Sequence, residues 1–312
     1  MSQKLDSSIN DIVSAIIDSY RSDEYLIRVD STYQINKEII IDLLEKLRSL
    51  IYIGFFSHKP LKFDSIEYHV GELVEDISHN LQKQICRALR HRKPDGDFDH
   101  ESAVITHRFL SRIPALRSLL ATDVEASYEG DPAAFSKDEI ILSYPGIYAI
   151  TVNRLAHELY LLGVPLIPRM MTEHAHSLTG IDIHPGATIG HHLFIDHGTG
   201  LVIGETTVIG NHVKIYQGVT LGALSTRGGH LLDGVKRHPT IESHVTIYAG
   251  ASILGGSTVI GEGVVIGSNA FITTSIPEKT KVSVKNTDLQ FMTDKKPVSK
   301  EFLQDDFWDY MI

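Results

Sequence analysis

Aliphatic residues recur every six positions between residues 181 and 272. They are Ile183, Ile189 and Ile195; Ile203, Ile209, Ile215 and Leu221; Ile241, Ile247 and Ile253; and Ile260, Ile266 and Ile272. A period of six fits neither the 3.6-residue α-helix nor the two-residue alternation of a strand. It is typical of hexapeptide repeats that coil into a parallel β-helix, in which short strands stack their aliphatic side chains inward. A β-sandwich would not hold one period over the whole segment.

The six-residue period breaks at two places, and both breaks carry titratable residues. Eight residues separate Ile195 from Ile203, which inserts two extra residues around His197. A second break of twenty residues follows Leu221 and contains Arg237. We expect this second stretch to leave the coil as an exposed loop, and such loops on rigid scaffolds commonly carry function.

The segments on either side of the coil have a different character. Residues 1–178 show apolar positions at helical spacing, which predicts an α-helical domain that supports oligomerisation or substrate binding. Residues 179–276 form the predicted catalytic coil, and residues 277–312 a flexible tail. The tail holds the only tryptophan, and its acidic, aromatic end at Tyr310, Met311 and Ile312 favours a motif that folds on a partner. The predicted fold class is therefore α + β.

Composition and charge exclude several classes of protein function. The chain of 312 residues has a net charge of −10, which argues against a broad surface for nucleic acid or anionic lipid. A single cysteine, Cys86, excludes an internal disulfide and fits a reducing compartment. No apolar run has the length of a membrane span or a secretion signal. We expect a cytoplasmic protein.

Histidines are concentrated in the coil. Ten of the 17 lie between His174 and His244, which suggests a metal site, but no third ligand is evident from the spacing and we expect no metal. Asp182 and His197 make a sharper pair. Fifteen residues plus the local insertion come close to one coil, so the carboxylate could orient the imidazole as a general base. The nucleophile would then come from the substrate, and chance proximity of the two residues stays open.

Four motifs carry a family resemblance. They are Asp182-Ile-His-Pro-Gly-Ala-Thr-Ile-Gly190, Asp196-His-Gly-Thr-Gly-Leu-Val-Ile-Gly-Glu205, Gln217-Gly-Val-Thr-Leu-Gly222 and Arg237-His-Pro239. They resemble the catalytic region of bacterial-type serine O-acetyltransferases over about residues 125–275. The resemblance implies an N-terminal helical domain and a left-handed parallel β-helix that trimerises, often as a dimer of trimers. It also implies acetyl transfer from acetyl-CoA to the hydroxyl of L-serine, the first step of cysteine biosynthesis.

The resemblance assigns roles to individual residues. His197 is expected to be the general base, oriented by Asp182. Asp131 and Asp196 match acids that bind the amino group of serine. Arg237 matches the residue that pairs with the serine carboxylate, a task suited to a guanidinium fork, and His238 completes the pocket. Acetyl-CoA is expected along the coil between subunits, at Gly222, Ala223, Ala249, Gly250 and Ser268.

The resemblance also implies regulation and a partner. L-cysteine is expected to inhibit at the serine site, and Ile312, Met311 and Tyr310 to bind O-acetylserine sulfhydrylase. Two departures affect the acetyl-CoA contacts: the loop before Arg237 is longer than in shorter members, and Ala223 and Leu224 stand where a Gly-Gly-Thr run is common. The alternatives are a hexapeptide acetyltransferase for another hydroxyl or amine, a metalloprotein like the γ-class carbonic anhydrases, and an inactive scaffold.

Overall fold

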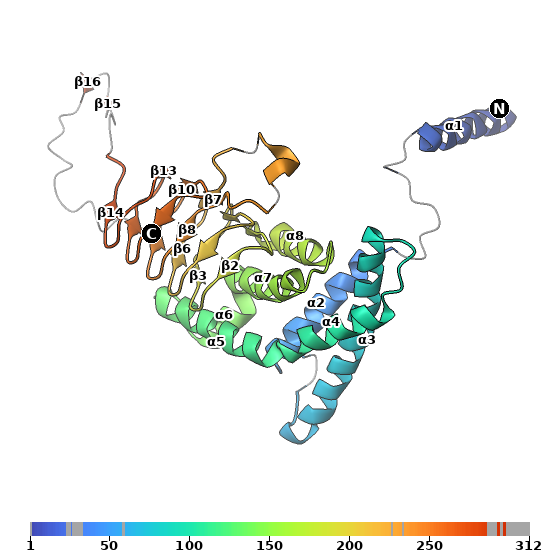
Figure 1. Cartoon of the computed structure of the whole chain (residues 1–312), viewed down its shortest axis with the longest axis horizontal. Helices are drawn as coiled ribbons and strands as arrows, with labels where there is room; N and C mark the ends of the chain where they lie inside the picture. The colour runs from blue at the N-terminus through green and yellow to red at the C-terminus, as the bar shows by residue number, and fades with distance from the viewer. Residues whose placement is uncertain are drawn as a thin grey trace.

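The computed structural model describes residues 2–22, 26, 34–57, 60–225, 227–232, 234–285, 292–293 and 296–297. In these ranges a helical region precedes a region of short parallel strands, as predicted (Figure 1). The helices are α1 (Ser2–Ser22), α2 (Lys37–Ile51), η1 (Phe63–Ser65), α3 (Ile66–Arg92), α4 (Asp99–Ser111), α5 (Ile113–Gly130), α6 (Lys137–Ser143), α7 (Pro145–Leu161) and α8 (Ile167–Thr179).

Local sequence signals set several helix ends. Asn36 caps α2 by accepting the backbone N–H groups of Glu38 and Ile39, and Ser136 caps α6 in the same way. Pro145 opens α7, where its missing N–H costs nothing. α8 ends at Gly180, whose φ of +70° suits glycine.

The strands form three parallel sheets, and each turn of the chain adds one strand to each sheet. Sheet A contains β1 (Asp182–Ile183), β4 (Val202–Ile203), β7 (Thr220–Gly222), β10 (Ser252–Leu254) and β13 (Phe271–Ile272). Sheet B contains β2 (Thr188–Ile189), β5 (Val208–Ile209), β8 (Thr240–Ile241) and β11 (Val259–Ile260). Sheet C contains β3 (Phe194–Ile195), β6 (Lys214–Ile215), β9 (Thr246–Ile247), β12 (Val265–Ile266) and β14 (Lys281–Val282). The arrangement is a three-sided parallel coil.

Three columns of turns connect the sheets, and we name them by the sheets they join. The AB corner comprises residues 184–187, 204–207, 223–239 and 255–258. The BC corner comprises residues 190–193, 210–213, 242–245 and 261–264. The CA corner comprises residues 196–201, 216–219, 248–251 and 267–270.

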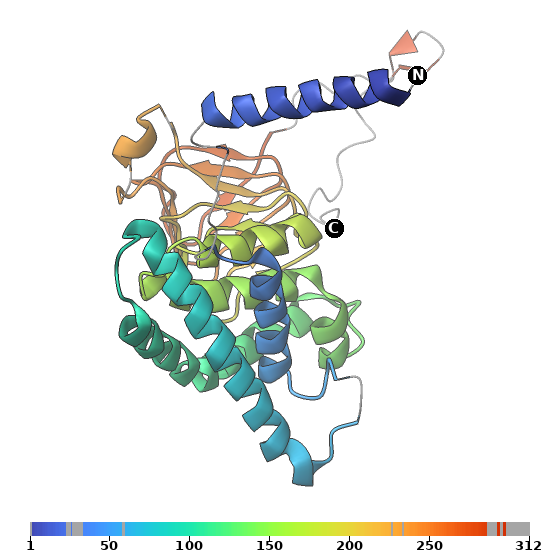
Figure 2. The same ribbon diagram turned by 90° about the vertical axis from the view of Figure 1, so that its right-hand side faces the viewer.

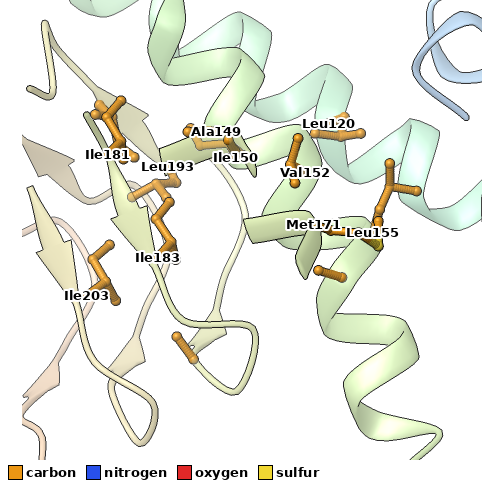
Figure 3. Packing of buried hydrophobic residues seen from close by; sticks show 14 of the residues in the cluster. Leu120, Ala149, Ile150, Val152, Leu155, Met171, Ile181, Ile183, Leu193 and Ile203 are labelled. Carbon is orange, nitrogen blue, oxygen red and sulfur yellow. The ribbon is translucent and has the colours of Figure 1, made fainter. Parts of the chain in front are cut away.

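The predicted inward aliphatic residues form the core of the coil. All of them are buried except Ile189, which is half-buried. The register of the sheets stacks aliphatic residues of successive turns on one another. Ile203, for example, pairs with Ile183 in the preceding turn and with Leu221 in the next. This core continues into the helices, where Ile183 and Leu193 lie close to Ala149 (Figure 3).

Both breaks in the period have a structural counterpart. Between β7 and β8 the chain leaves the coil, and the short helix η2 (Gly229–Leu232) projects from it (Figure 1). β8 then rejoins the coil on β5, with Thr240 opposite Val208. The stacking also runs past the expected boundary at residue 276, because β14 pairs with β12. A further short hairpin joins β15 (Met292–Thr293) and β16 (Lys296–Pro297).

The helical region covers the first turn of the coil (Figure 2). Asp123 of α5 and Arg154 of α7 form a buried ion pair, with Nε and Oδ2 2.6 Å apart. Arg154 also donates to the carbonyls of Ile189 and Gly190, and Asp123 accepts the N–H of Leu193. The pair therefore ties two helices to the BC corner.

Within the described ranges no helix is both long and apolar enough to cross a bilayer. α1 is amphipathic, and its apolar side chains, among them Ile12 and Ile16, are exposed in the single chain.

Candidate active site

The extra residues of the first break widen the CA corner around His197. His197 has a φ of +54°, and its side chain is 61% exposed. The next residue, Gly198, is buried with a φ of +81°, and a Cβ there would overlap the side chain of Ile181. Glycine at 198 thus allows the widened turn to pack on the coil while the imidazole points outward. Asp196 lies beside it, with its Oδ1 3.7 Å from His197 Nε2.

A second carboxylate reaches this corner from the helical region. Asp131 follows the last residue of α5, and its Oδ2 accepts a 2.5 Å hydrogen bond from the hydroxyl of Tyr144. Its Oδ1 accepts the N–H of Ala133 at 2.8 Å. These two hydrogen bonds, the one from Tyr144 first, lower the pKa of Asp131.

Electrostatic coupling shows that these groups share one space. Burial raises the pKa of Asp196, the positive charge of His197 opposes that rise, and the charge of Asp131 adds to it. The pKa of Tyr216, raised mainly by burial, responds to both carboxylates. Tyr216 stacks on Tyr248 one turn further on, with ring centroids 5.0 Å apart. The structure therefore brings together Asp131, Asp196 and His197, and adds tyrosines that the sequence motifs did not reveal.

Asp182 occupies a different environment from the one expected. One turn of the coil at this level takes twenty residues, because Asp182 pairs with Val202. The interpretation of fifteen residues as about one coil was wrong, since His197 lies at the corner before that turn is complete. Asp182 Oδ1 lies 3.4 Å from Arg169 Nη1, and no contact recorded for the described residues joins it to His197. Its orienting role stays a prediction.

Arg237 and His238 lie at the AB corner, where the long loop returns to the coil. Thr206 holds both residues, since its hydroxyl accepts the backbone N–H groups of Arg237 and His238 at 2.9 and 3.0 Å. The Arg237 guanidinium forms an ion pair with Glu205, which also accepts the hydroxyl of Tyr160 at 3.0 Å. Burial opposes ionisation of Glu205, but these two hydrogen bonds outweigh it and its pKa is lowered.

His238 is held as a neutral imidazole. Burial, reinforced by the charge of Arg237, lowers its pKa to about 4. Its Nδ1 accepts a hydrogen bond from the N–H of Thr206, with the two nitrogens 3.0 Å apart, so the neutral ring carries its own proton on Nε2. The ring lies against Gly204, where any Cβ would overlap it. His238 can therefore donate a hydrogen bond to a ligand at neutral pH.

The residues expected to contact acetyl-CoA divide between the same two corners. Ala249, Gly250 and Ser268 continue the column of His197 along the CA corner. Gly222 and Ala223 lie at the other end of the strands of sheet A, where β7 runs into the AB corner. The predicted site residues thus form two groups on either side of sheet A. Tyr310, Met311 and Ile312 lie outside the described residues.

Gln217 adds a polar atom to the CA corner. Its Oε1 is buried and has no hydrogen-bond partner among the described residues.

A coil of hexapeptide repeats with an exposed histidine and two carboxylates at one corner fits an acyltransferase of the hexapeptide-repeat class, although the coil alone does not decide its function. No protein-family model matches the chain. It is 46% identical over 211 residues to the plasmid serine acetyltransferase of Synechococcus elongatus, a match that covers 64% of this chain and 66% of that protein. The chain spans about half to two thirds of the length of such curated relatives.

Solved structures cover more of the chain. Serine acetyltransferase isoform 3 from Entamoeba histolytica in complex with cysteine matches with a TM-score of 0.70 and 36% identity, over 90% of this chain and 93% of that one. The Neisseria gonorrhoeae serine acetyltransferase in complex with serine matches with a TM-score of 0.52 and 28% identity, over 78% and 95% of the two chains. The chain belongs to the serine acetyltransferase family.

Proposed function

We propose that this protein transfers the acetyl group of acetyl-CoA to the hydroxyl of L-serine, giving O-acetyl-L-serine and CoA, the first step of cysteine biosynthesis. The observation that carries the proposal is the pair of His197 and Asp196 at the CA corner, 3.7 Å apart, with Asp131 at the end of α5 near enough to affect the charge of both. Two carboxylates suit the ammonium group of an amino acid, and an exposed imidazole beside them suits its hydroxyl. A serine complex of a relative is consistent with this substrate.

The reaction is a direct attack without a covalent enzyme intermediate. His197 takes the proton of the serine hydroxyl while the oxygen attacks the thioester carbonyl. The C–S bond then breaks, and the thiolate of CoA leaves and takes the proton back from the imidazolium. A positioned base of this kind contributes about 10²- to 10⁴-fold in rate. Asp182 is proposed to orient His197 in the catalytic state.

A complete site requires a second chain. Arg237 and His238 would bind the serine carboxylate, yet they lie across sheet A from His197. We propose that the coil is left-handed and trimeric, alone or as a dimer of trimers, so that the AB corner of one subunit faces the CA corner of the next. A guanidinium has five N–H donors, so Arg237 can hold Glu205 and a substrate carboxylate together. Acetyl-CoA would lie along this junction at Gly222, Ala223, Ala249, Gly250 and Ser268.

Regulation and location complete the proposal. L-cysteine shares the amino and carboxylate groups of serine and would compete for the same pocket, as the cysteine complex of the Entamoeba relative supports. The division at residue 178, a cytoplasmic location and binding of O-acetylserine sulfhydrylase by the C-terminal residues are parts of the same proposal, whereas the boundary expected at residue 276 moves past β14. Co-purification of that enzyme with a chain lacking residues 309–312 would contradict the last part.

The alternative is a hexapeptide acetyltransferase for another hydroxyl or amine. Such an enzyme would keep the coil and the acetyl-CoA site but would not need Asp131, Asp196 and Arg237 to bind an amino acid.

The deciding experiment measures thiol release from acetyl-CoA by the full chain with L-serine, L-homoserine or a galactoside as acceptor. We expect L-serine to give the highest kcat/KM. His197→Ala is expected to lose at least about a hundredfold in kcat, the lower range of general-base catalysis, while acetyl-CoA binding persists in calorimetry. Turnover of His197→Ala at the wild-type rate, or preference for the galactoside, would overturn the proposal.

A further inference from the structure

One position of the BC corner is a histidine in three successive turns. His192, His212 and His244 occupy equivalent places, three residues after the paired Ile189, Ile209 and Ile241. Their φ values are +57°, +56° and +61°. The fourth turn has Gly263 at this place, with a φ of +68°.

Histidine is not what this backbone conformation requires. Left-handed φ costs a residue with a side chain about 1–3 kcal/mol, and such strain is commonly kept where it serves a function. Gly263 shows that the corner itself closes without an imidazole. The repeated rings therefore point to a role for the imidazoles themselves.

The rings of the first two turns converge. His192 stacks on His212 with centroids 4.2 Å apart, and His191 meets both rings edge-on at 4.8 and 5.2 Å. The Nδ1 atoms of His191 and His192 are 2.6 Å apart. One ring nitrogen from each of the three histidines lies within 4.8 Å of the others.

α5 holds the corner in place and adds a carboxylate. Thr122 accepts the backbone N–H of His192 at 3.1 Å, and the buried Asp123 accepts that of Leu193 at 2.9 Å. One turn along the helix, Glu125 Oε2 lies 3.8 Å from His192 Nε2. The backbone around two of the histidines is therefore fixed by the helical region, as a prearranged ligand set requires.

We propose that His191, His192 and His212 bind a divalent transition-metal ion such as zinc, with water as the fourth ligand, or Glu125 once it leaves its 3.4 Å ion pair with Lys137. Imidazole is a preferred ligand of zinc, and tetrahedral coordination at Zn–N distances of about 2.0–2.1 Å places ligand nitrogens roughly 3.4 Å apart. Binding would require the side chains to rotate, because the rings of His192 and His212 are stacked in this structure. The site lies at the BC corner, away from His197, so the ion would join the first two turns of the coil to α5 and take no part in acetyl transfer.

A second cluster of possible ligands is a weaker candidate. Glu173, His176 and Asp182 also lie close together. Arg169, however, already places a guanidinium between its two acids, 2.5 Å from Glu173 and 3.4 Å from Asp182. A metal ion at this cluster would have to compete with the Arg169 guanidinium for the two carboxylates.

The test uses the full, untagged chain, stripped of metal with a chelator and dialysed. Zinc affinity is measured by competition with a chromophoric chelator, and Co²⁺ is added to read the coordination geometry from its visible spectrum. We expect one Zn²⁺ per chain and the intense absorption of tetrahedral Co²⁺. Zinc should also raise the melting temperature, since it binds the native state.

Single substitutions identify the ligands. His191→Asn and His212→Asn should weaken zinc binding at least tenfold and reduce the rise in melting temperature at a fixed zinc concentration, and asparagine tolerates the left-handed φ at 212. His244→Asn is the matched control, because it has the same place and φ one turn further on but lies outside the ligand set. It should bind zinc as the wild type does, and so should His176→Asn. No bound zinc in the wild type, equal affinity in His212→Asn, or loss of binding in His176→Asn would overturn the proposal. None of these readouts depends on acetyl transfer.

Discussion

At the residue scale, the two carboxylates of the CA corner are prepared differently. Asp131 is held ionised by the hydroxyl of Tyr144 and the backbone of Ala133, whereas burial pushes Asp196 toward its neutral form. The hydroxyl of Tyr144 both fixes the position of Asp131 and favours its charged form, which an ammonium group would contact. Tyr144 is therefore expected to act as a positioning residue for substrate binding.

Removal of one hydroxyl tests this role. Tyr144→Phe keeps the ring but takes the hydrogen bond from Asp131. A hydrogen bond to a charged group contributes about 1.5–3 kcal/mol, so we expect KM for serine to rise by roughly tenfold or more with a smaller change in kcat. Steady-state kinetics with serine varied at saturating acetyl-CoA would measure both. Tyr128→Phe, another tyrosine near the end of α5, is the control, and an unchanged KM in Tyr144→Phe would contradict the role.

At the scale of elements, the junction between helices and coil depends on one buried ion pair. Asp123 is fully buried, and Arg154 satisfies it while bonding the carbonyls at the end of β2. The same carboxylate fixes the backbone of the BC corner through Leu193. α5 can place Asp131 near the CA corner because this pair fixes its position on the coil.

Breaking the pair should be costly. Arg154→Met leaves the buried Asp123 carboxyl without its partner, and loss of one partner of a buried pair costs about 3–5 kcal/mol. We expect the free energy of unfolding in urea to fall by that amount. Arg112→Met provides the comparison. Arg112 forms an ion pair with Glu158, and the Arg112 side chain is 56% exposed. Exposed pairs contribute about 0–1 kcal/mol. Equal effects of the two substitutions would refute the role of the buried pair.

At the scale of the whole molecule, the two halves of the proposed site lie at the two corners that flank sheet A, one at each end of its strands. A single chain cannot close that distance, because the sheet between them is part of a rigid packed coil. A cyclic assembly solves the problem, since each subunit then lends one edge to each neighbour.

Mixed assemblies test this arrangement. His197→Ala and Arg237→Ala are each expected to be inactive. The two variants are denatured together in equal amounts and refolded into mixed trimers. At each junction between subunits, the chain that supplies His197 is intact at that residue in half of the cases. The neighbouring chain that supplies Arg237 is, independently, intact there in half of the cases. About a quarter of wild-type activity should therefore return if the sites are shared between subunits. The variants refolded separately and then mixed serve as the control. Failure of the co-refolded mixture to regain activity, with trimers confirmed by light scattering, would place each site within one chain.

The sequence by itself determined that residues 181–272 form a coil of hexapeptide repeats and at which residues the regular repeat is interrupted. Nearly every aliphatic residue on the six-residue period is buried, because an inward position must be apolar in each turn whatever its neighbours are. The two breaks marked the corner at His197 and the loop before Arg237 for the same reason, since residues that leave the coil lose that constraint. The catalytic motifs are continuous stretches of the chain, so the order of their residues was enough to identify them.

Contacts between distant residues were decided only by the tertiary structure. Tyr144 reaches Asp131 across the intervening α6, and Glu205 meets Arg237 only because the long loop returns to the AB corner. The histidines at 191, 192 and 212 gave no recognisable ligand spacing, because a full turn of twenty residues separates 192 from 212. One turn also takes twenty residues at Asp182, which corrected its expected place relative to His197. Stacking between turns depends on the exact length of every corner, and the period alone does not specify that length.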